Sequence, residues 1–314
     1  MFGPVEDYPR NLAAFERRFA SEQACRLYLA QLRWPDGFRC PRCRGQKAWP
    51  ARAGRLWHCA ACGHQTSVTA GTIFQDTRTP LTTWFRAMWW LTNQKTGVSA
   101  LGLQRLLGLR SYKTAWAWLH KLRRGMVRPG RDRLTGDVEV DETYVGGVHP
   151  GRRGRQTETK ALVVVAVEIE DRRRLGRIRL RRIPDASADS LLTFIQDVIE
   201  PRSRVHTDGW PSYDGLRRLG YKHQVTFLQG QASAPSQLLP HVHRVVSLLK
   251  RWLLGTHQGA VTHEHLEYYL DEFTFRFNRR RSTSRGKLFY RLAEQAVAVA
   301  PAPYESLVRY ARMP

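Results

Sequence analysis

The sequence predicts an α/β protein in which a mixed β-sheet domain follows a small metal-binding module and a helical segment. Three features support this: two Cys-x2-Cys pairs near the N-terminus, helical periodicity after them, and strand-like apolar runs between amphipathic helices in the second half. We expect five successive parts: a helical segment over 1–35, the metal module over 36–75, a helix pair over 76–130, the mixed-sheet domain over 131–295 and a tail over 296–314.

The chain is strongly basic. Its 314 residues include 51 Lys+Arg against 27 Asp+Glu, a formal net charge of +24. Residues 1–136 hold 23 basic and 7 acidic residues, a net charge of +16, and the remaining 28 basic and 20 acidic residues give +8. A surplus of this size favours binding to polyphosphate backbones. We therefore expect double-stranded DNA as a partner, with the N-terminal part as the docking end.

Nothing in the sequence favours a membrane as the partner. The longest clean apolar run, Ala161–Val167, is far shorter than a membrane span. The first ten residues lack the charged and apolar regions of a signal peptide. We expect no membrane partner and a cytoplasmic, nucleoid-associated protein.

Four of the five cysteines form two Cys-x2-Cys pairs, Cys40–Cys43 and Cys59–Cys62, with fifteen residues between the pairs. This spacing predicts a zinc ribbon in which two short knuckles hold one structural zinc ion through four thiolates. Disulfides and buried thiols are the alternatives; a reducing cytoplasm disfavours the first and the paired spacing disfavours the second. Cys25 stands alone at helical spacing with leucines, so we expect a thiol of the core.

The segment after the ribbon predicts helices over residues 80–127. A helix that Ser99 caps should end near Gly108, and a second helix should run from Tyr112 to about Arg124 after a turn that ends at Ser111. Two helices joined by a three-residue turn are typical of a helix-turn-helix motif. An ordinary helical hairpin with a solvated basic face is the alternative. In the first interpretation DNA is contacted by the start of the second helix, at Arg110, Lys113 and Thr114.

The second half predicts a ribonuclease-H-like mixed sheet. Ala161–Ile169 is a continuous apolar run, as expected of a strand that is buried on both faces. A Gly-rich basic loop over 146–160 precedes it. The other expected elements are strands at Asp137–Val145, Arg177–Ile183 and Arg204–His206, and helices at Ser187–Ile199, His243–Leu254 and His263–Phe277.

Two aspartates each end a short apolar stretch, Asp141 after Val138–Val140 in GDVEVDETYVGG and Asp208 after Arg204–His206 in SRVHTDGWPSY, and we expect both carboxylates at strand ends. Carboxylates that rigid elements hold side by side can bind hard divalent cations. His243 follows Asp208 by 35 residues, and Lys250 lies two helical turns later on the same helix side. Such a site predicts phosphodiester chemistry with two Mg²⁺ or Mn²⁺ ions. Turn-capping aspartates are the alternative.

Three neighbouring residues need separate expectations. Glu139 and Glu142 are expected on the strand face opposite Asp141, with structural or supporting roles. His241 is the alternative to His243 as a ligand, although the spacing to Lys250 favours His243.

The chain resembles bacterial insertion-sequence transposases of the DDE superfamily, in the group with an N-terminal zinc ribbon. The resemblance rests on CPRC…CAAC, VEVDETYVGG, HTDGWPSY, HVHRVVSLLKRWLLGTHQG and HLEYYLDEFTFRFNRR, which span most of the chain. It implies a ribonuclease-H-like core, two-metal cleavage and joining of DNA, and assembly of several copies on element ends.

The resemblance also implies roles for single residues. Asp141 and Asp208 match the two invariant acidic ligands of the family, and Lys250 matches the basic residue that follows the third. His243 falls where many relatives have Glu or Asn, and imidazole is a poorer Mg²⁺ ligand than a carboxylate. Direct metal binding by His243, better function with Mn²⁺ and an impaired copy all stay open.

We therefore expect a DNA transposase that binds element ends, cleaves DNA and joins the 3′-OH ends to target DNA, as a homo-oligomer. A non-catalytic DNA-binding regulator and a structure-selective nuclease on the same fold are the alternatives. The aspartate pair counts against the regulator, and a nuclease would cleave without joining.

Overall fold

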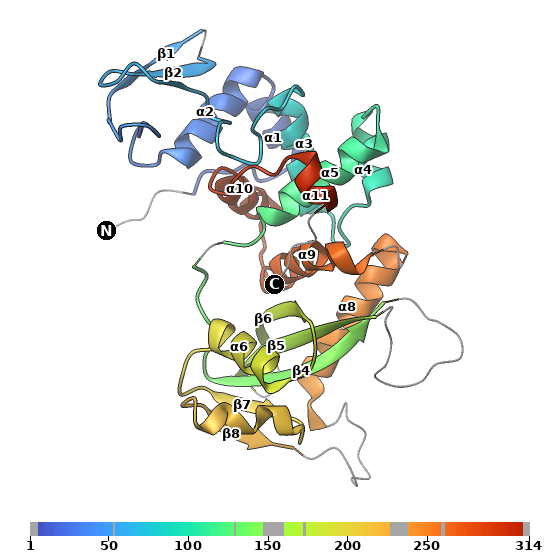
Figure 1. Ribbon diagram of the computed structural model, residues 1–314. Coiled ribbons are helices and arrows are strands. Elements are labelled where there is room, and N and C mark those ends of the chain that lie inside the picture. The colour runs from blue at the N-terminus through green and yellow to red at the C-terminus, as the bar shows by residue number, and fades with distance from the viewer. Residues whose placement is uncertain are drawn as a thin grey trace. The chain divides into compact units, whose positions relative to one another are not determined.

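The computed structural model describes residues 6–52, 54–128, 130–146, 160–171, 174–226, 238–258 and 261–309, and the chain divides into two compact units (Figure 1). One unit comprises Met1–Arg128 with Arg281–Arg309, and the other spans Pro129–Arg280. None of the described helices combines the length and apolarity needed to cross a membrane. Each unit has a core of its own.

The first unit contains the zinc-ribbon region and a bundle of helices. The ribbon is a three-stranded antiparallel sheet in the order β1-β2-β3. Its strands are β1 (Ala48–Ala51), β2 (Leu56–Cys59) and β3 (Gln65–Thr66). The helices are α1 (Leu12–Arg18), α2 (Glu22–Arg33), α3 (Leu81–Asn93), α4 (Ala100–Leu107), α5 (Tyr112–Arg124), α10 (Arg285–Ala296) and α11 (Tyr304–Arg309).

An aromatic cluster holds this bundle together. Phe15 of α1 stacks on Trp89 of α3 at 4.7 Å between ring centroids. Phe289 of α10 lies within 5.8 Å of both rings, and Phe85 of α3 lies 5.7 Å from Phe289. Helix α10 therefore belongs to the core of the first unit. Our placement of residues 281–295 in the mixed-sheet segment was wrong, because long-range apolar contacts rather than chain order decide where this helix packs.

The second unit is built on a five-stranded mixed sheet in the order β6-β5-β4-β7-β8. The first three strands pair antiparallel, whereas β7 and β8 run parallel to β4. This arrangement is the expected ribonuclease-H-like topology. The strands are β4 (Asp137–Val145), β5 (Ala161–Asp171), β6 (Arg174–Ile183), β7 (Arg204–Thr207) and β8 (Lys222–Val225). The expected loop over 146–160 lies almost wholly outside the described residues.

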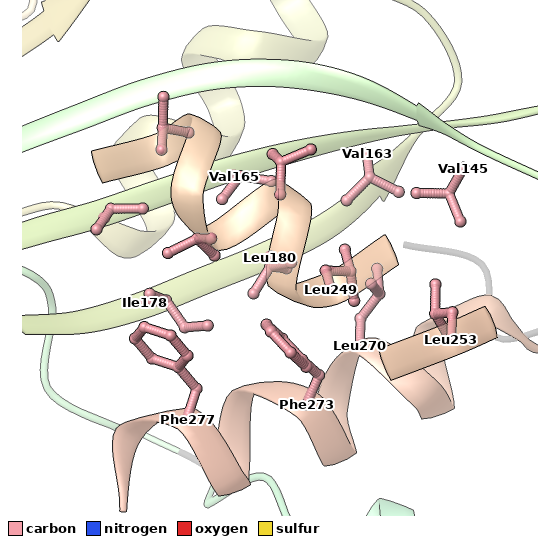
Figure 2. Close-up of a cluster of buried hydrophobic side chains, with 14 of the residues drawn as sticks. Val145, Val163, Val165, Ile178, Leu180, Leu249, Leu253, Leu270, Phe273 and Phe277 are labelled. Atoms are coloured by element: carbon pink, nitrogen blue, oxygen red, sulfur yellow. The ribbon is translucent and has the colours of Figure 1, made fainter. Parts of the chain in front are cut away.

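Helices cover both faces of this sheet. Helix α6 (Ala188–Val198) and the 3₁₀ helix η1 (Pro211–Arg217) pack on one face, where Val138 and Val140 of β4 are buried. Helices α8 (Pro240–His257) and α9 (Leu266–Asn278), the latter preceded by the 3₁₀ turn η2 (His263–His265), pack on the other. Figure 2 shows this second core, where side chains of the sheet meet Leu249, Leu253, Leu270, Phe273 and Phe277.

Candidate functional site

The four paired cysteines converge in the ribbon. Within the described ranges, Cys40, Cys43, Cys59 and Cys62 are the one group of three or more Cys, His, Asp or Glu whose ligand atoms all lie within 4.8 Å of one another. The Sγ atoms of Cys40 and Cys62 are 3.7 Å apart and those of Cys43 and Cys59 are 3.6 Å apart. Thiolates about 2.3 Å from one tetrahedral zinc stand about 3.8 Å apart. The cluster therefore fits a structural zinc ion.

The backbone around the knuckles supports the same geometry. The amide of Gly45 donates to Sγ of Cys43 at 3.4 Å, and the amide of Cys40 donates to the carbonyl of Gly45 at 2.9 Å. A Cβ at Gly45 would stand 3.3 Å from the Sγ atoms of Cys43 and Cys59. Glycine thus lets the chain pass close to the sulfur atoms.

Helices α4 and α5 have the expected helix-turn-helix spacing. Gly108 ends α4 in the left-handed region at φ 61°, and Ser111 caps α5 by accepting from the amide of Lys113 at 3.2 Å. Arg110 and Lys113 are exposed and Thr114 is half-buried. The geometry therefore leaves the two cations, Arg110 and Lys113, open to a ligand.

Asp141 lies in the middle of β4 and not at the strand end where we expected it, because β4 continues to Val145, whereas Asp208 directly follows the end of β7. Strands β4 and β7 pair in parallel with Glu139 opposite His206. Two residues further along each strand, this register leads to Asp141 and to Asp208, which directly follows β7. Oδ1 of Asp141 accepts from the amide of Glu142 at 2.9 Å, and Oδ1 of Asp208 accepts from the amide of Trp210 at 3.1 Å.

His243 stands over Asp141 from helix α8. Its Nε2 atom lies 3.8 Å from Oδ2 of Asp141 and is buried without a hydrogen-bond partner among the described residues. The pKa of His243 is lowered, chiefly by partial burial, with Lys250 adding to the fall and Glu139 opposing it. A neutral ring offers a lone pair, so Nε2 can serve as a metal ligand once a cation is present.

Lys250 lies on the same helix and is exposed. The pKa of Lys250 is lowered mainly by desolvation of the ammonium group beside the sheet and then by Lys160, while Asp141 acts in the opposite sense. Both helix residues are therefore within electrostatic reach of Asp141, as the seven-residue spacing predicts.

The electrostatics of Asp141 favour a cation. Burial raises the pKa of Asp141 from 3.8 to about 7, with Glu142, Asp208 and Glu139 as the further causes. Several carboxylates thus surround a buried acid in a chain whose net charge is +24. Divalent cations bind to such oxygen clusters and relieve their repulsion. Asp141, Asp208 and the unpartnered Nε2 of His243 are donors of a kind that can bind Mn²⁺ and, less well, Mg²⁺, and their ligand atoms do not all lie within 4.8 Å of one another in the structure.

The face of Glu139 differs from our expectation. Residues two apart on a strand point to the same face, so Glu139 shares the face of Asp141. It accepts from Nδ1 of His241 at 2.6 Å and from the amides of His241 and Val242 at 2.8 Å. His241 is therefore engaged with Glu139. Glu142 does lie on the other face, where Oε2 accepts from the hydroxyl of Tyr213 at 2.9 Å.

The raised pKa of Asp141 predicts a pH-dependent gain in stability when the charge is removed. A carboxyl with a folded pKa of about 7 and an ordinary value of 3.8 destabilises the fold progressively as pH rises between these values. In chelator, Asp141→Asn should therefore raise the free energy of unfolding at about pH 8, by on the order of 2–4 kcal/mol. Urea titrations should show a clearly smaller gain at about pH 5. A gain of equal size at both pH values would contradict the electrostatic origin.

The fold and the two sites define a protein that joins a four-thiolate ribbon to a ribonuclease-H-like domain with a carboxylate-lined site. The model of the ISXO2-like transposase domain matches residues 133–278, and that of the transposase zinc-ribbon domain matches residues 20–65. The chain therefore matches, in two separate regions, the zinc-ribbon domain and the transposase domain of this family of insertion-sequence transposases. The uncharacterized protein in transposable element ISH50 of Halobacterium salinarum is 27% identical over 281 residues, covering 83% of this chain and 92% of that protein.

Solved structures with a similar fold include a viral integrase and a transposase. The catalytic core domain of BIV integrase aligns at a TM-score of 0.32 and 21% identity, over 48% of this chain and 89% of that one. The Mos1 strand transfer complex aligns at a TM-score of 0.28 and 15% identity, over 68% and 75% of the two chains. These likenesses are distant, and the strand order itself defines the fold.

Proposed function

We propose that this transposase binds the ends of its element, cleaves the DNA there and joins the freed 3′-OH ends to target DNA. The observation that carries the proposal is the placement of Asp141 and Asp208 on adjacent parallel strands beneath the unpartnered Nε2 of His243. A regulator that only binds DNA has no use for a buried acid with a pKa of about 7 among other carboxylates.

In this proposal Asp141, Asp208 and His243 hold two divalent cations. Magnesium or manganese, when bound, activates a water or a 3′-hydroxyl and stabilises the leaving oxygen. The strands fix both carboxylates, so that little reorganisation is needed on binding. Lys250 holds a phosphate of the DNA end as a point charge.

DNA docking is assigned to the first unit together with Lys250. The helix-turn-helix geometry of α4 and α5 and the excess charge of residues 1–136 support this assignment. Binding to two element ends at once requires more than one copy, so we propose a homo-oligomer on DNA. The site of action is then the nucleoid.

The third ligand position gives a graded prediction. His243→Ala should lower cleavage less than loss of either aspartate, because a neutral ligand contributes less to holding two cations. His243→Glu should retain cleavage and raise the ratio of Mg²⁺ to Mn²⁺ activity, since an oxygen ligand suits Mg²⁺ better. Cleavage rates with each metal would measure both effects. A His243→Glu protein that works only with Mn²⁺ would exclude direct ligation at this position.

The helix pair gives a prediction on DNA affinity. Arg110→Ala and Lys113→Ala should each weaken binding to the element end by about 1–3 kcal/mol if the side chains contact bases. If they contact phosphates, affinity should fall equally on random duplex DNA, with a weaker salt dependence. Arg86→Ala removes an exposed cation from α3 and serves as the charge-matched control. Unchanged affinity in both variants would remove this helix pair from the interface.

Joined products distinguish the proposal from a structure-selective nuclease. The substrates are labelled duplexes that cover the DNA immediately flanking the coding sequence, incubated with a plasmid and either metal. A transposase yields labelled plasmid, whereas a nuclease yields cut duplex alone. A regulator yields neither product but still shifts the labelled duplex in a binding assay.

A further inference from the structure

Helix α8 begins without a cap of its own. Leu239 occupies the N-cap position and makes no side-chain hydrogen bond, and Pro240 follows at the first helical position. The amides of the first helical turn have no partner inside a helix and need an external acceptor. Elsewhere in the chain Ser99, Ser111 and Ser187 supply that acceptor locally.

For α8 the acceptor comes from strand β4. Oε2 of Glu139 accepts from the amides of His241 and Val242 at 2.8 Å each, and Oε1 accepts from Nδ1 of His241 at 2.6 Å. Glu139 is only 4% exposed. A buried carboxylate at the positive end of an 18-residue helix also interacts favourably with the helix dipole.

The bonded residues flank the metal-site residues on both elements. Glu139 is two residues before Asp141 on one strand face, and His241 is two residues before His243 in the same helical turn. The Val242 side chain between them is fully buried against the sheet. Three hydrogen bonds therefore fix both the rotation and the start of α8 above β4.

We propose that Glu139 is a positioning residue that caps α8 from the central strand and thereby holds His243 beside Asp141. This inference rests on the proposed metal site and adds the group that builds it. The length of the Glu139 side chain is what matters, because its two carboxylate oxygens must extend from β4 to three hydrogen-bond donors on α8. Glu139 itself does not contact the DNA.

Two conservative variants separate the effect of the side-chain length of Glu139 from the effect of its negative charge. In Glu139→Gln the amide oxygen can accept from both backbone amides and the amide nitrogen can donate to Nδ1 of His241, so that all three bonds persist without the charge. In Glu139→Asp the charge persists, but the side chain is one methylene shorter and cannot span to the helix. Glu168→Asp is the matched control, because Glu168 is a buried strand glutamate that bonds to Thr135 and Arg177 on the opposite face of the sheet.

The first measurement is hydrogen–deuterium exchange of the peptide that covers the first turn of α8, in full-length protein without metal. The second is the Mn²⁺ concentration that gives half of the thermal stabilisation. We expect Glu139→Gln to match the wild type in both. Glu139→Asp should exchange faster in that peptide and shift the Mn²⁺ midpoint upward by about 10–100-fold, the usual effect of losing a group that orients a ligand.

Three results would overturn the proposal. They are a Glu139→Asp protein with wild-type exchange and midpoint, a Glu139→Gln protein as impaired as Glu139→Asp, and a Glu168→Asp control with the same midpoint shift. Neither measurement needs DNA, so failure of cleavage or joining leaves this test intact. If Mn²⁺ stabilises no variant, the metal site itself fails, and exchange alone then decides whether Glu139 caps the helix.

Discussion

Asp208→Asn and Asp141→Asn should each abolish DNA cleavage and joining while DNA binding survives. Each change removes a charged ligand from the proposed metal pair and alters the side-chain volume very little. Metal ions contribute several kcal/mol of charge stabilisation in such reactions, so the loss should be at least about a hundredfold. Cleavage and joining rates on labelled flanking duplexes, together with a mobility-shift titration, would measure both halves of this prediction.

Asp214→Asn is the matched control for this experiment. Asp214 lies six residues after Asp208 on η1 and is exposed, so its replacement should leave both rates unchanged. Normal joining by Asp208→Asn would contradict the mechanism, and loss of DNA binding in either site variant would assign the aspartates to folding instead.

Cys40→Ser should release the zinc ion and unfold the ribbon. Structural zinc contributes about 10–16 kcal/mol of apparent binding free energy, and small ribbons lack a core that could replace it. The ribbon core consists of Phe38, Cys40 and Cys59, with Trp34 and Trp57 packed against it. Elemental analysis should find about one zinc per wild-type chain and far less in the variant, and limited proteolysis should cut residues 36–75 first.

Cys25 provides the control for the zinc experiment. It is fully buried in α2 and takes no part in the four-cysteine group. Cys25→Ser should retain the zinc ion even though it loses some packing stability. Full zinc retention in Cys40→Ser would contradict the four-thiolate assignment.

The elements that local signals specify could be predicted from the sequence. The apolar run Ala161–Val167 forms the fully buried first part of β5, and Ser99, Ser111 and Ser187 cap the helices that follow them. The cysteine spacing was sufficient for the ribbon because zinc imposes its own geometry. Asp141 and Asp208 come together because β4 and β7 run parallel with Glu139 opposite His206, although Asp141 lies in the middle of β4 and not at a strand end.

Strand β8 and the start of helix α8 could not be predicted from the sequence, because both depend on contacts between residues far apart in the chain. Strand β8 has the polar sequence KHQV and lies at an edge, so it carries no apolar periodicity. Helix α8 begins at Pro240, three residues earlier than expected, because its cap is Glu139, about a hundred residues upstream. Two features of the sequence could have indicated this cap. The start of α8 lacks a Ser, Thr, Asp or Asn, and a glutamate stands between two valines of β4.

The most direct test of the central claim is the joining reaction of the wild-type chain. Labelled flanking duplex, target plasmid and either Mg²⁺ or Mn²⁺ are incubated with the full-length protein, and products are resolved before and after addition of chelator. The proposed mechanism predicts labelled plasmid that forms only with a divalent metal and is absent with Asp208→Asn. Specific binding of the duplex without any cleaved or joined product under either metal would contradict it and favour the non-catalytic regulator.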